Sequence, residues 1–530
     1  MAIDLLISGG TVVDGSGGAG RRADLAVEGG RVRLLAADAP VANVGRRIDA
    51  QGMIVAPGFI DLHSHSGLMI LAHPHHDAKV RQGVTSEVIG VDGLSYAPLP
   101  GDAELHALVE MNAGLDGRPE LAYDWDSVNS YLERIDGQVS VNVGLLVGNS
   151  ALRICRLGWD DVPADEAALS DMCAMLRESM AAGALGISTG LDYPPGSYAS
   201  TDELAALTGE AARAGGFYHT HVRYPLGDRF LDPFREAVEI GRRGDGPVHI
   251  THFYHREAHP GGPEELLQLV DEARAEGLDV TFDTYPYEWA ATRLLIQLPQ
   301  WVQAGGPARL KERLADRKMR ERLRQELDAR GAAYTSPAGW ADVRLGYFSQ
   351  PQNLPFEGRT LADVMAAREV DALDAICDLL LEEDLRVNQV TSGPWHETLH
   401  HFVRHPVGMV GTDSTFIGDK PSPRTYGSFP RILGEFVRER ELVGLEEAIR
   451  KMTSAPAARL GLADRGLLHD GYQADVVVFD PATVRSNATY AEPRRYPTGI
   501  EYVIVNGVLV VDGGRHSGAT PGRVLGRGER

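Results

Sequence analysis

The sequence predicts an α/β protein, a (β/α)8 TIM-like barrel with a small β-sandwich domain formed by both termini and a lid between strands seven and eight. Three observations support this prediction. Eight short apolar runs alternate with helical stretches between residues 56 and 460. Short β-like segments with glycine turns lie at both ends of the chain. Polar side chains suited to metal binding follow most of the eight runs.

The two ends of the chain have the same sequence pattern, with short β-like runs separated by turns. Residues 1–55 contain short β-like runs separated by turn signals such as Gly29-Gly30. Residues 461–530 contain similar runs, with an Asn506-Gly507 hairpin signal and a Gly/Arg-rich tail. Neither end is long enough for a core of its own, so we expect the two to form one small β domain.

The barrel is expected over residues 56–460. Its first strand lies in the β-forming run Ile54–Leu62, which continues into Ala56–Gly67, APGFIDLHSHSG. Helical stretches, often opened by Ser, Thr, Asp or Pro, separate the later strands. Those seven strands are expected at Glu87–Val91, Val141–Val147, Leu185–Ser188, Phe217–His221, Val248–His252, Asp279–Tyr285 and Val407–Gly411.

A long segment, about residues 297–387, separates the last two strands. It contains a charged helical run, Arg309–Arg330, and a small β-like piece, Val343–Phe348. Long insertions in compact domains tend to carry function. We therefore expect this segment to form a lid or subdomain over the catalytic face.

Composition restricts the function classes. The chain has 530 residues, a net charge of −22 and 43% hydrophobic residues. Nucleic acids and anionic membranes bind basic faces, so we expect neither partner. The charge says little about a small-molecule substrate, which is the partner that we expect. The N-terminus lacks signal-peptide features, and no window is apolar enough to span a membrane. Cys155, Cys173 and Cys377 form no disulfide pattern, which favours the cytoplasm, and the oligomeric state stays open.

Candidate metal ligands follow the carboxyl ends of five runs. His63 and His65, two residues apart, point to the same side of a strand, and Asp61 could join that face. Because a barrel of this kind keeps its active site at these ends, the side chains should meet there. Imidazoles and carboxylates suit Zn²⁺ or a similar divalent ion, one or two in number. The six ligands are His63, His65, Asp92, His221, His252 and Asp413.

We do not expect the other histidines considered next to be metal ligands. His219 and His249 precede two of the ligands, and we expect them to pack or to support those ligands. Seven more lie where no strand end presents them, so we expect surface or supporting roles. These are His73, His75, His76, His396, His400, His401 and His405.

The strand APGFIDLHSH resembles the amidohydrolase superfamily, and the chain is most similar to the N-acyl-D-amino-acid deacylases, or D-aminoacylases. The matching motifs run in the family's order over nearly the whole chain. The resemblance implies the barrel, the β domain, the lid and amide hydrolysis at zinc. The motifs include RQGVTSEVIG (81–90), STGLDYPPGSYAS (188–200), TYPY (284–287), GTDS (411–414), SPRTYGSFPRIL (422–433) and PTGIEYVIVNG (497–507).

Carried over by resemblance, His63, His65 and Asp413 form one metal site. His221 and His252 are then ligands of the tightly bound zinc. Asp92 stands where the family has a cysteine thiolate, so the number and identity of the metals are open.

Substrate-binding residues also follow from the resemblance. Tyr193 and Arg424 lie where the family holds the substrate carboxylate, and Tyr285 lies in the TYPY motif. Tyr254 replaces a usual lysine, and Ala291 stands where a serine is expected. Together with Glu288 and the apolar surface of Trp289, these changes indicate an altered substrate.

The sequence therefore predicts hydrolysis of an N-acyl-D-amino acid or a related N-acyl compound. A metal would activate water, and Asp413 would take its proton and return it to the leaving nitrogen. One alternative is a cyclic amide hydrolase of the hydantoinase or dihydroorotase sort, whose usual carboxylated lysine is missing from Ile187–Thr189. Another is a metal-poor binding barrel, which the six occupied ligand positions disfavour.

Overall fold

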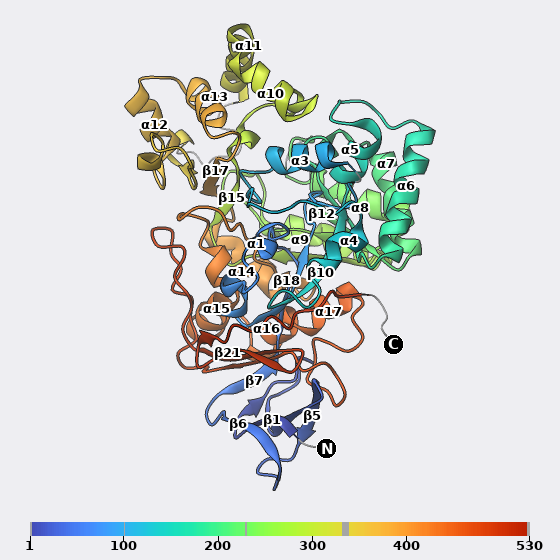
Figure 1. Ribbon diagram of the computed structural model, residues 1–530, viewed down its shortest axis with the longest axis vertical. Coiled ribbons are helices and arrows are strands. Elements are labelled where there is room, and N and C mark those ends of the chain that lie inside the picture. Colours follow the sequence, from blue (N-terminus) through green and yellow to red (C-terminus); the bar gives the residue numbers. More distant parts are fainter. Residues whose placement is uncertain (1–2, 100, 228–229, 331–338, 527–530) are drawn as a thin grey trace.

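The computed structural model describes residues 3–99, 101–227, 230–330 and 339–526. The molecule is elongated, and Figure 1 shows three parts along its length: the N-terminal sheet strands at one end, the barrel in the middle and helices α10–α13 at the other end. Residues 527–530 of the predicted tail lie outside the described residues. Among the described residues, no helix combines the length and the apolar character needed to cross a membrane.

The middle part is the predicted barrel. Its eight strands form one sheet in chain order, and each strand pairs in parallel with its neighbours in that order. Every residue of these strands is buried, as expected for a parallel sheet covered on both faces. The TIM-like fold class is thus confirmed. The strands are β8 (Phe59–Asp61), β9 (Val84–Ile89), β10 (Asn142–Gly148), β11 (Gly186–Gly190), β12 (Phe217–His221), β13 (Val248–Ile250), β14 (Val280–Thr284) and β18 (Gly408–Val410).

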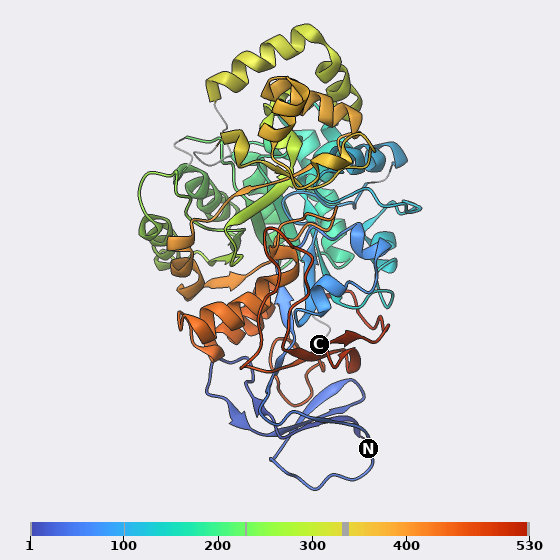
Figure 2. The ribbon, with the colours of Figure 1, turned by 90° about the vertical axis from the view of Figure 1, so that its left-hand side faces the viewer.

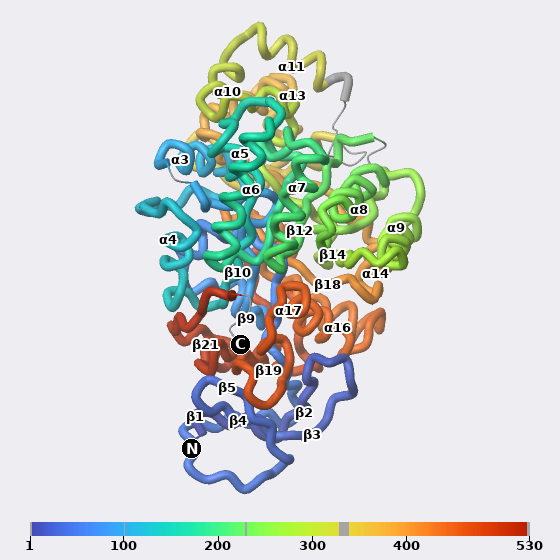
Figure 3. Tube along the Cα trace, turned by 90° about the vertical axis from the view of Figure 1, so that its right-hand side faces the viewer, coloured from blue at the N-terminus to red at the C-terminus, as the bar shows by residue number. Residues whose placement is uncertain are grey.

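Helices cover the outside of the barrel, and Figure 3 shows α5–α9 along one side of it. Side-chain caps set where several begin: Asp165 accepts from the Ala168 amide before α6, and Ser200 accepts from the Glu203 amide before α7. The barrel helices are α1 (Met69–Ala72), α2 (Asp77–Val80), α3 (Asp102–Met111), α4 (Val128–Glu133), α5 (Asn149–Leu157), α6 (Glu166–Ala181), α7 (Thr201–Arg213), α8 (Asp232–Gly244), α9 (Pro263–Ala275), α14 (His396–Arg404), α15 (Arg424–Arg431), α16 (Leu445–Met452) and α17 (Ser454–Leu460).

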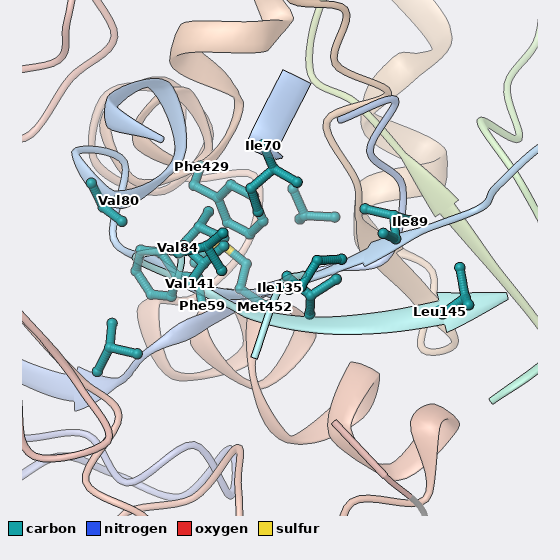
Figure 4. Close-up of a cluster of buried hydrophobic side chains, with 14 of the residues drawn as sticks. Phe59, Ile70, Val80, Val84, Ile89, Ile135, Val141, Leu145, Phe429 and Met452 are labelled. Carbon is teal, nitrogen blue, oxygen red and sulfur yellow. The ribbon is translucent and has the colours of Figure 1, made fainter. Parts of the chain in front are cut away.

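A buried apolar cluster packs the first two barrel strands, β8 and β9, against helices α15 and α16. The ring of Phe59 on β8 stacks on Phe429 of α15, with centroids 5.5 Å apart. Figure 4 shows this pair with Val84 of β9 and Met452 of α16 around it. Burying each such side chain contributes roughly 1.5–3 kcal/mol, so this cluster firmly positions the start of β8 and β9.

The barrel closes through the segments that follow its first and last strands. β8 and β18 share no ladder, but Ser64 and Ser414 form an isolated parallel bridge. The His65 amide donates to the Ser414 carbonyl (3.0 Å), and the Asp413 amide donates to the His63 carbonyl (2.9 Å). The same backbone hydrogen bonds therefore close the barrel and position three predicted ligands, His63, His65 and Asp413.

Both termini build two packed sheets, which confirms the small β sandwich. One sheet has the order β5-β4-β1-β6 and the other β22-β21-β20-β19-β7-β2-β3. Leu5 and Val27 of the first sheet share a core cluster with Val55 and Val478 of the second. The strands are β1 (Ile3–Ser8), β2 (Thr11–Val12), β3 (Arg21–Arg22), β4 (Asp24–Glu28), β5 (Arg31–Leu35), β6 (Val44–Asp49), β7 (Ile54–Pro57), β19 (Val476–Phe479), β20 (Ile500–Val505), β21 (Val508–Asp512) and β22 (Arg515–His516).

The run Ile54–Leu62, predicted as one barrel strand, is divided between two sheets. β7 pairs with β2 and β19 in the terminal sandwich, and β8 begins the barrel after Gly58. Only glycine fits between them, because a Cβ on Gly58 would lie 2.1 Å from the Thr85 hydroxyl. β8 ends at Asp61, so His63 and His65 follow the strand and are not part of it.

The insertion contains helices and its own small sheet, β15-β17-β16. Figure 2 shows its helices at the end of the molecule opposite the terminal sheets. Strands β15 and β17 flank the predicted segment 297–387 and connect it to the barrel. The elements are β15 (Trp289–Arg293), α10 (Gly306–Ala315), α11 (Arg317–Arg330), β16 (Arg344–Leu345), α12 (Leu361–Arg368), α13 (Ala372–Glu382) and β17 (Asn388–Ser392), with short 3-10 turns between them.

Candidate metal centre

Four of the predicted ligands lie close together at the carboxyl end of the barrel. Asp92 Oδ2 lies 3.4 Å from His63 Nε2 and 3.5 Å from His65 Nε2. Asp413 Oδ1 lies 3.5 Å and 3.4 Å from the same two nitrogens. Ligand atoms around a tetrahedral zinc with bonds of about 2.1 Å are about 3.4 Å apart. The spacing therefore fits one zinc-sized ion.

The other two predicted ligands lie near the same oxygen of Asp92. His221 Nδ1 and His252 Nε2 are 2.9 Å apart, and they lie 3.7 Å and 3.9 Å from Asp92 Oδ2. One carboxylate oxygen thus faces two groups of ligands. A carboxylate can bridge two cations, so the structure brings all six predicted residues into an arrangement that suits one ion or a closely spaced pair.

Three of these ligands sit at unusual backbone turns. The φ angles of Asp92, His252 and Asp413 are 52°, 34° and 46°, in a region that side-chain-bearing residues rarely adopt. Gly190 lies against the Asp92 turn so closely that a Cβ would approach the Asp92 carbonyl to 2.0 Å. Such strain is characteristic of functional sites, and here each turn follows a barrel strand and redirects a ligand.

The centre has a strongly negative potential. Burial alone would lower the pKa of His63, but Asp92, Asp413 and Asp283 raise it to about 10. Burial likewise opposes the effect of Asp192 and Asp92, which raise the pKa of His221 to about 9. Neither ring nitrogen of His63 has a hydrogen-bond partner among the described residues. A buried site with this charge and these free nitrogens fits a cation.

Carboxylates behind the imidazoles orient them, and sequence reasoning missed these residues. His65 Nδ1 donates to Asp116 Oδ1 (3.0 Å), and His221 Nε2 donates to Asp192 Oδ2 (3.1 Å). When each ring is neutral, its opposite nitrogen therefore presents a lone pair to the centre. Asp192 follows β11 within the motif at 188–200, which was a usable signal, whereas Asp116 lies in a loop after α3 with no such signal.

A further buried group lies beside the centre. His249 Nε2 donates to Asp283 Oδ2 (3.0 Å), and the His219 ring stacks on His249 at 5.2 Å. Asp283 Oδ1 accepts from the His252 amide (3.0 Å), so this group supports a ligand turn, in the supporting place assigned to His219 and His249.

Asp61 and His76 are both buried, and each contacts a charged side chain. Asp61 does not join the ligands, because its carboxylate pairs with Lys79 and accepts from Thr412. His76 is 5% exposed, with Nε2 3.0 Å from Glu87, and is the one fully buried member of its group of seven.

A cavity opens on the centre. Three of the predicted substrate residues, Tyr193, Tyr254 and Tyr285, line it. The insertion forms one wall through Ala290, Ala291, Thr292, Ile296, Gln389 and Thr391, and the remaining lining residues are His65, Asp92, Asp192, His221, Tyr224, His252, Arg256 and Asp413.

Two predicted substrate residues lie outside this lining. Arg424 is fully buried behind Asp413, with Nη1 2.8 Å from Asp413 Oδ2, and Nη2 donates to the Ala291 carbonyl (3.1 Å). Trp289 lines an adjoining hollow and stacks on Tyr490, with ring centroids 4.2 Å apart.

Known proteins similar to this chain share its architecture. The model of the amidohydrolase family matches residues 46–511. N-acyl-D-aspartate deacylase and N-acyl-D-glutamate deacylase of Alcaligenes xylosoxydans xylosoxydans are 35% and 36% identical to it, over 99% of this chain and 95% and 97% of theirs. The crystal structure of N-acyl-D-glutamate deacylase from Bordetella bronchiseptica, complexed with zinc and a phosphonate inhibitor that mimics the tetrahedral intermediate, is 32% identical with a TM-score of 0.84, covering 99% of this chain and 100% of that one.

Proposed function

The chain belongs to the amidohydrolase family, and we propose that it removes the acyl group from N-acyl-D-amino acids or closely related N-acyl compounds. It is a metal-dependent hydrolase of amide C–N bonds. The observation that carries the proposal is the set of four distances of 3.4–3.5 Å between the oxygens of Asp92 and Asp413 and the nitrogens of His63 and His65.

In this proposal, two groups of residues hold zinc. One ion would be held by His63, His65, Asp92 and Asp413, and a second would be held by Asp92, His221 and His252. When bound, such an ion lowers the pKa of a coordinated water molecule towards neutrality and polarises the scissile carbonyl group.

Asp413 acts as the general base and then as the general acid. Burial would raise the pKa of its carboxyl, but Arg424 and His63 lower it to about 2, so the carboxylate is ionised at neutral pH. Its Oδ1 faces the centre while Oδ2 is held by Arg424. The carboxylate can accept a proton from the attacking water and return it to the leaving nitrogen.

The tyrosine-rich cavity receives the substrate. Tyr193, Tyr254 and Tyr285 present aromatic surface beside the ligands, and Trp289 extends this surface into the adjoining hollow. Carboxylate binding by Arg424 stays a prediction, because its guanidinium contacts Asp413 and not the cavity. The contact supports a role for Arg424 in orienting the base.

We further propose that the enzyme works on small molecules in the cytoplasm. The three cysteines are unpaired, and burial raises the pKa of the Cys377 thiol to about 12, so this thiol is unreactive. Such cysteines are typical of a reducing compartment.

The test is a hydrolysis screen of N-acetyl-D-amino acids and N-acetyl-L-amino acids beside cyclic amides, with zinc quantified in the same sample. We expect turnover of one or more N-acetyl-D-amino acids by zinc-loaded protein and loss of turnover after chelation. Turnover confined to cyclic amides would replace the proposal with the hydantoinase-like alternative. A zinc-loaded protein that hydrolyses none of these amides would overturn it.

A further inference from the structure

Arg256 lies where the metal cavity meets its neighbour. It lies six residues after the end of β13 and four residues after the ligand His252. It lines both the cavity that contains the ligands and the adjoining hollow with Trp289 and Trp395. It is the one lysine or arginine among the described residues that line the metal cavity.

The guanidinium of Arg256 is half-buried and pairs with no acidic side chain of the described residues. Among the described parts of the chain, no carboxylate lies within 4.0 Å of it. Its Nη2 donates to the Tyr254 hydroxyl (2.9 Å), and its carbon lies 5.3 Å and 5.6 Å from the ring centres of Tyr254 and Tyr224. A partly desolvated cation held only by neutral aromatic groups is stabilised when an anion binds it.

The other arginines near the cavity are already engaged. Arg424 pairs with Asp413, and Arg293 donates to the Met111 carbonyl (3.0 Å) and to Asn112. The acidic groups in the lining are Asp92, Asp192 and Asp413, and Asp92 and Asp413 are candidate metal ligands. Among the described residues of the lining, Arg256 therefore supplies the one guanidinium that can attract an anionic part of a ligand.

We propose that Arg256 binds a carboxylate of the substrate and thereby determines that the enzyme selects acidic N-acyl compounds. This inference rests on the proposed deacylase function. A guanidinium binds a carboxylate through two parallel hydrogen bonds, which also fixes its orientation. The hydroxyl of Tyr285, which is fully buried in the same lining and makes no hydrogen bond among the described residues, can donate to the bound group.

The experiment compares substrates that differ only in this charge. The wild type, Arg256→Gln and Arg256→Lys are assayed with the best N-acetyl-D-amino acid from the screen and with the α-carboxamide of that compound. N-acetyl-D-isoglutamine, which has a side-chain carboxylate and no α-carboxylate, distinguishes the two sources of the anion. The control is Arg242→Gln, a surface arginine that pairs with Glu239 and Glu276.

We expect the wild type to prefer the acid over its carboxamide. Arg256→Gln should lower kcat/KM for the acid roughly 10- to 150-fold, mainly through KM, because it removes a charge-assisted hydrogen bond. For the carboxamide, kcat/KM of Arg256→Gln should fall little. Arg256→Lys should keep part of the preference for the acid, and Arg242→Gln should have the kcat/KM of the wild type. Selective loss with N-acetyl-D-isoglutamine instead would assign Arg256 to a side-chain carboxylate.

Two results would overturn the inference. One is a wild type that hydrolyses a compound without any carboxylate as well as the corresponding acid, which requires no folded variant. The other is a zinc-loaded, folded Arg256→Gln that keeps the full preference for both kinds of carboxylate. In both cases turnover by the wild type leaves the deacylase function standing, whereas a wild type without activity on any N-acyl amino acid removes that function itself.

Discussion

The carboxylate of Asp92 is the point that both groups of ligands share. Its Oδ2 atom lies within 3.9 Å of four imidazole nitrogens, from His63, His65, His221 and His252. A carboxylate at this position keeps the negative charge of a thiolate but is a harder ligand.

The variant Asp92→Ala should lose most of its bound metal. Even the residues that only support metal ligands are worth about 10–100-fold in affinity, so a shared ligand should be worth more. The measurement is metal content after purification and dialysis. Asp92→Cys is the matched control, because it restores an anionic ligand, and it should retain zinc. Wild-type metal content in Asp92→Ala would exclude Asp92 from the ligand set.

The variant Asp413→Asn should separate catalysis from metal binding. The amide oxygen can still face His63 and His65, but it is not a base, so kcat should fall about 10²- to 10⁴-fold with nearly unchanged zinc. The readouts are single-turnover hydrolysis and metal content. Asp202→Asn, an exposed residue that pairs with Arg243, serves as the control. An active, zinc-loaded Asp413→Asn would show that another group takes the proton.

At the scale of elements, helix α2 joins the strands that carry the centre. Its Lys79 is fully buried and contacts Asp61 at the end of β8 and Thr412 after β18. The Lys79 ammonium also lies 3.6 Å from Glu87 of β9. This one cation therefore lies beside two buried carboxylates directly behind the segments that close the barrel.

The variant Lys79→Met should destabilise the protein by about 3–5 kcal/mol, because removing one partner leaves buried carboxylates without a cation. The measurement is the midpoint and slope of urea unfolding. Lys311→Met provides the comparison, since Lys311 is about a third exposed and pairs with Glu110 and Asp384 near the surface. That variant should cost about 0–1 kcal/mol. Equal losses in the two variants would contradict a special role for Lys79.

The small sheet of the insertion contributes side chains to the wall of the metal cavity. Strand β15 places Ala290, Ala291 and Thr292 in the cavity wall, and β17 adds Gln389 and Thr391. The two strands pair in antiparallel register from Trp289↔Ser392 to Arg293↔Asn388. The insertion thus forms one wall of the cavity through these two strands, and residues of its α-helices are not part of the described lining.

Metal binding and folding are coupled over the whole molecule, because the barrel closes through His63, His65 and Asp413. Zinc that binds only the folded chain should stabilise it by about 2.7 kcal/mol at a free concentration one hundred times the Kd. Chelation should therefore lower the Tm, and zinc should restore it. An unchanged Tm would mean that the barrel closes equally well without the ion.

The pH dependence of this coupling has a definite sign. Without metal, the raised pKa values of His63 (about 10) and His221 (about 9) stabilise the folded chain below pH 6.5, and this stabilisation is lost as the pH rises through 9 to 10. Metal requires both rings neutral, so zinc addition at pH 7 should release protons, and the Tm gap should widen towards pH 9. Calorimetry in two buffers of different ionisation enthalpy measures the release.

The sequence by itself determined the barrel and the six ligand candidates. Apolar runs of strand length alternate with helices, and parallel strands converge at one end, so a residue such as His221 or Asp413 can be placed from local pattern alone. The same local pattern could not show that Ile54–Leu62 is divided between two sheets. The division at Gly58 depends on the approach of Thr85, which is a contact between separate strands.

Only the tertiary structure decided which side chains support the ligands and which cation faces the cavity. Asp116 reaches His65 across 51 residues of chain, and Asp192 reaches His221 across 29. Arg424 is turned towards Asp413, whereas Arg256 is left without a carboxylate partner in the described chain. Such pairings depend on distances and directions between distant segments, and neither residue type nor spacing along the chain contains that information.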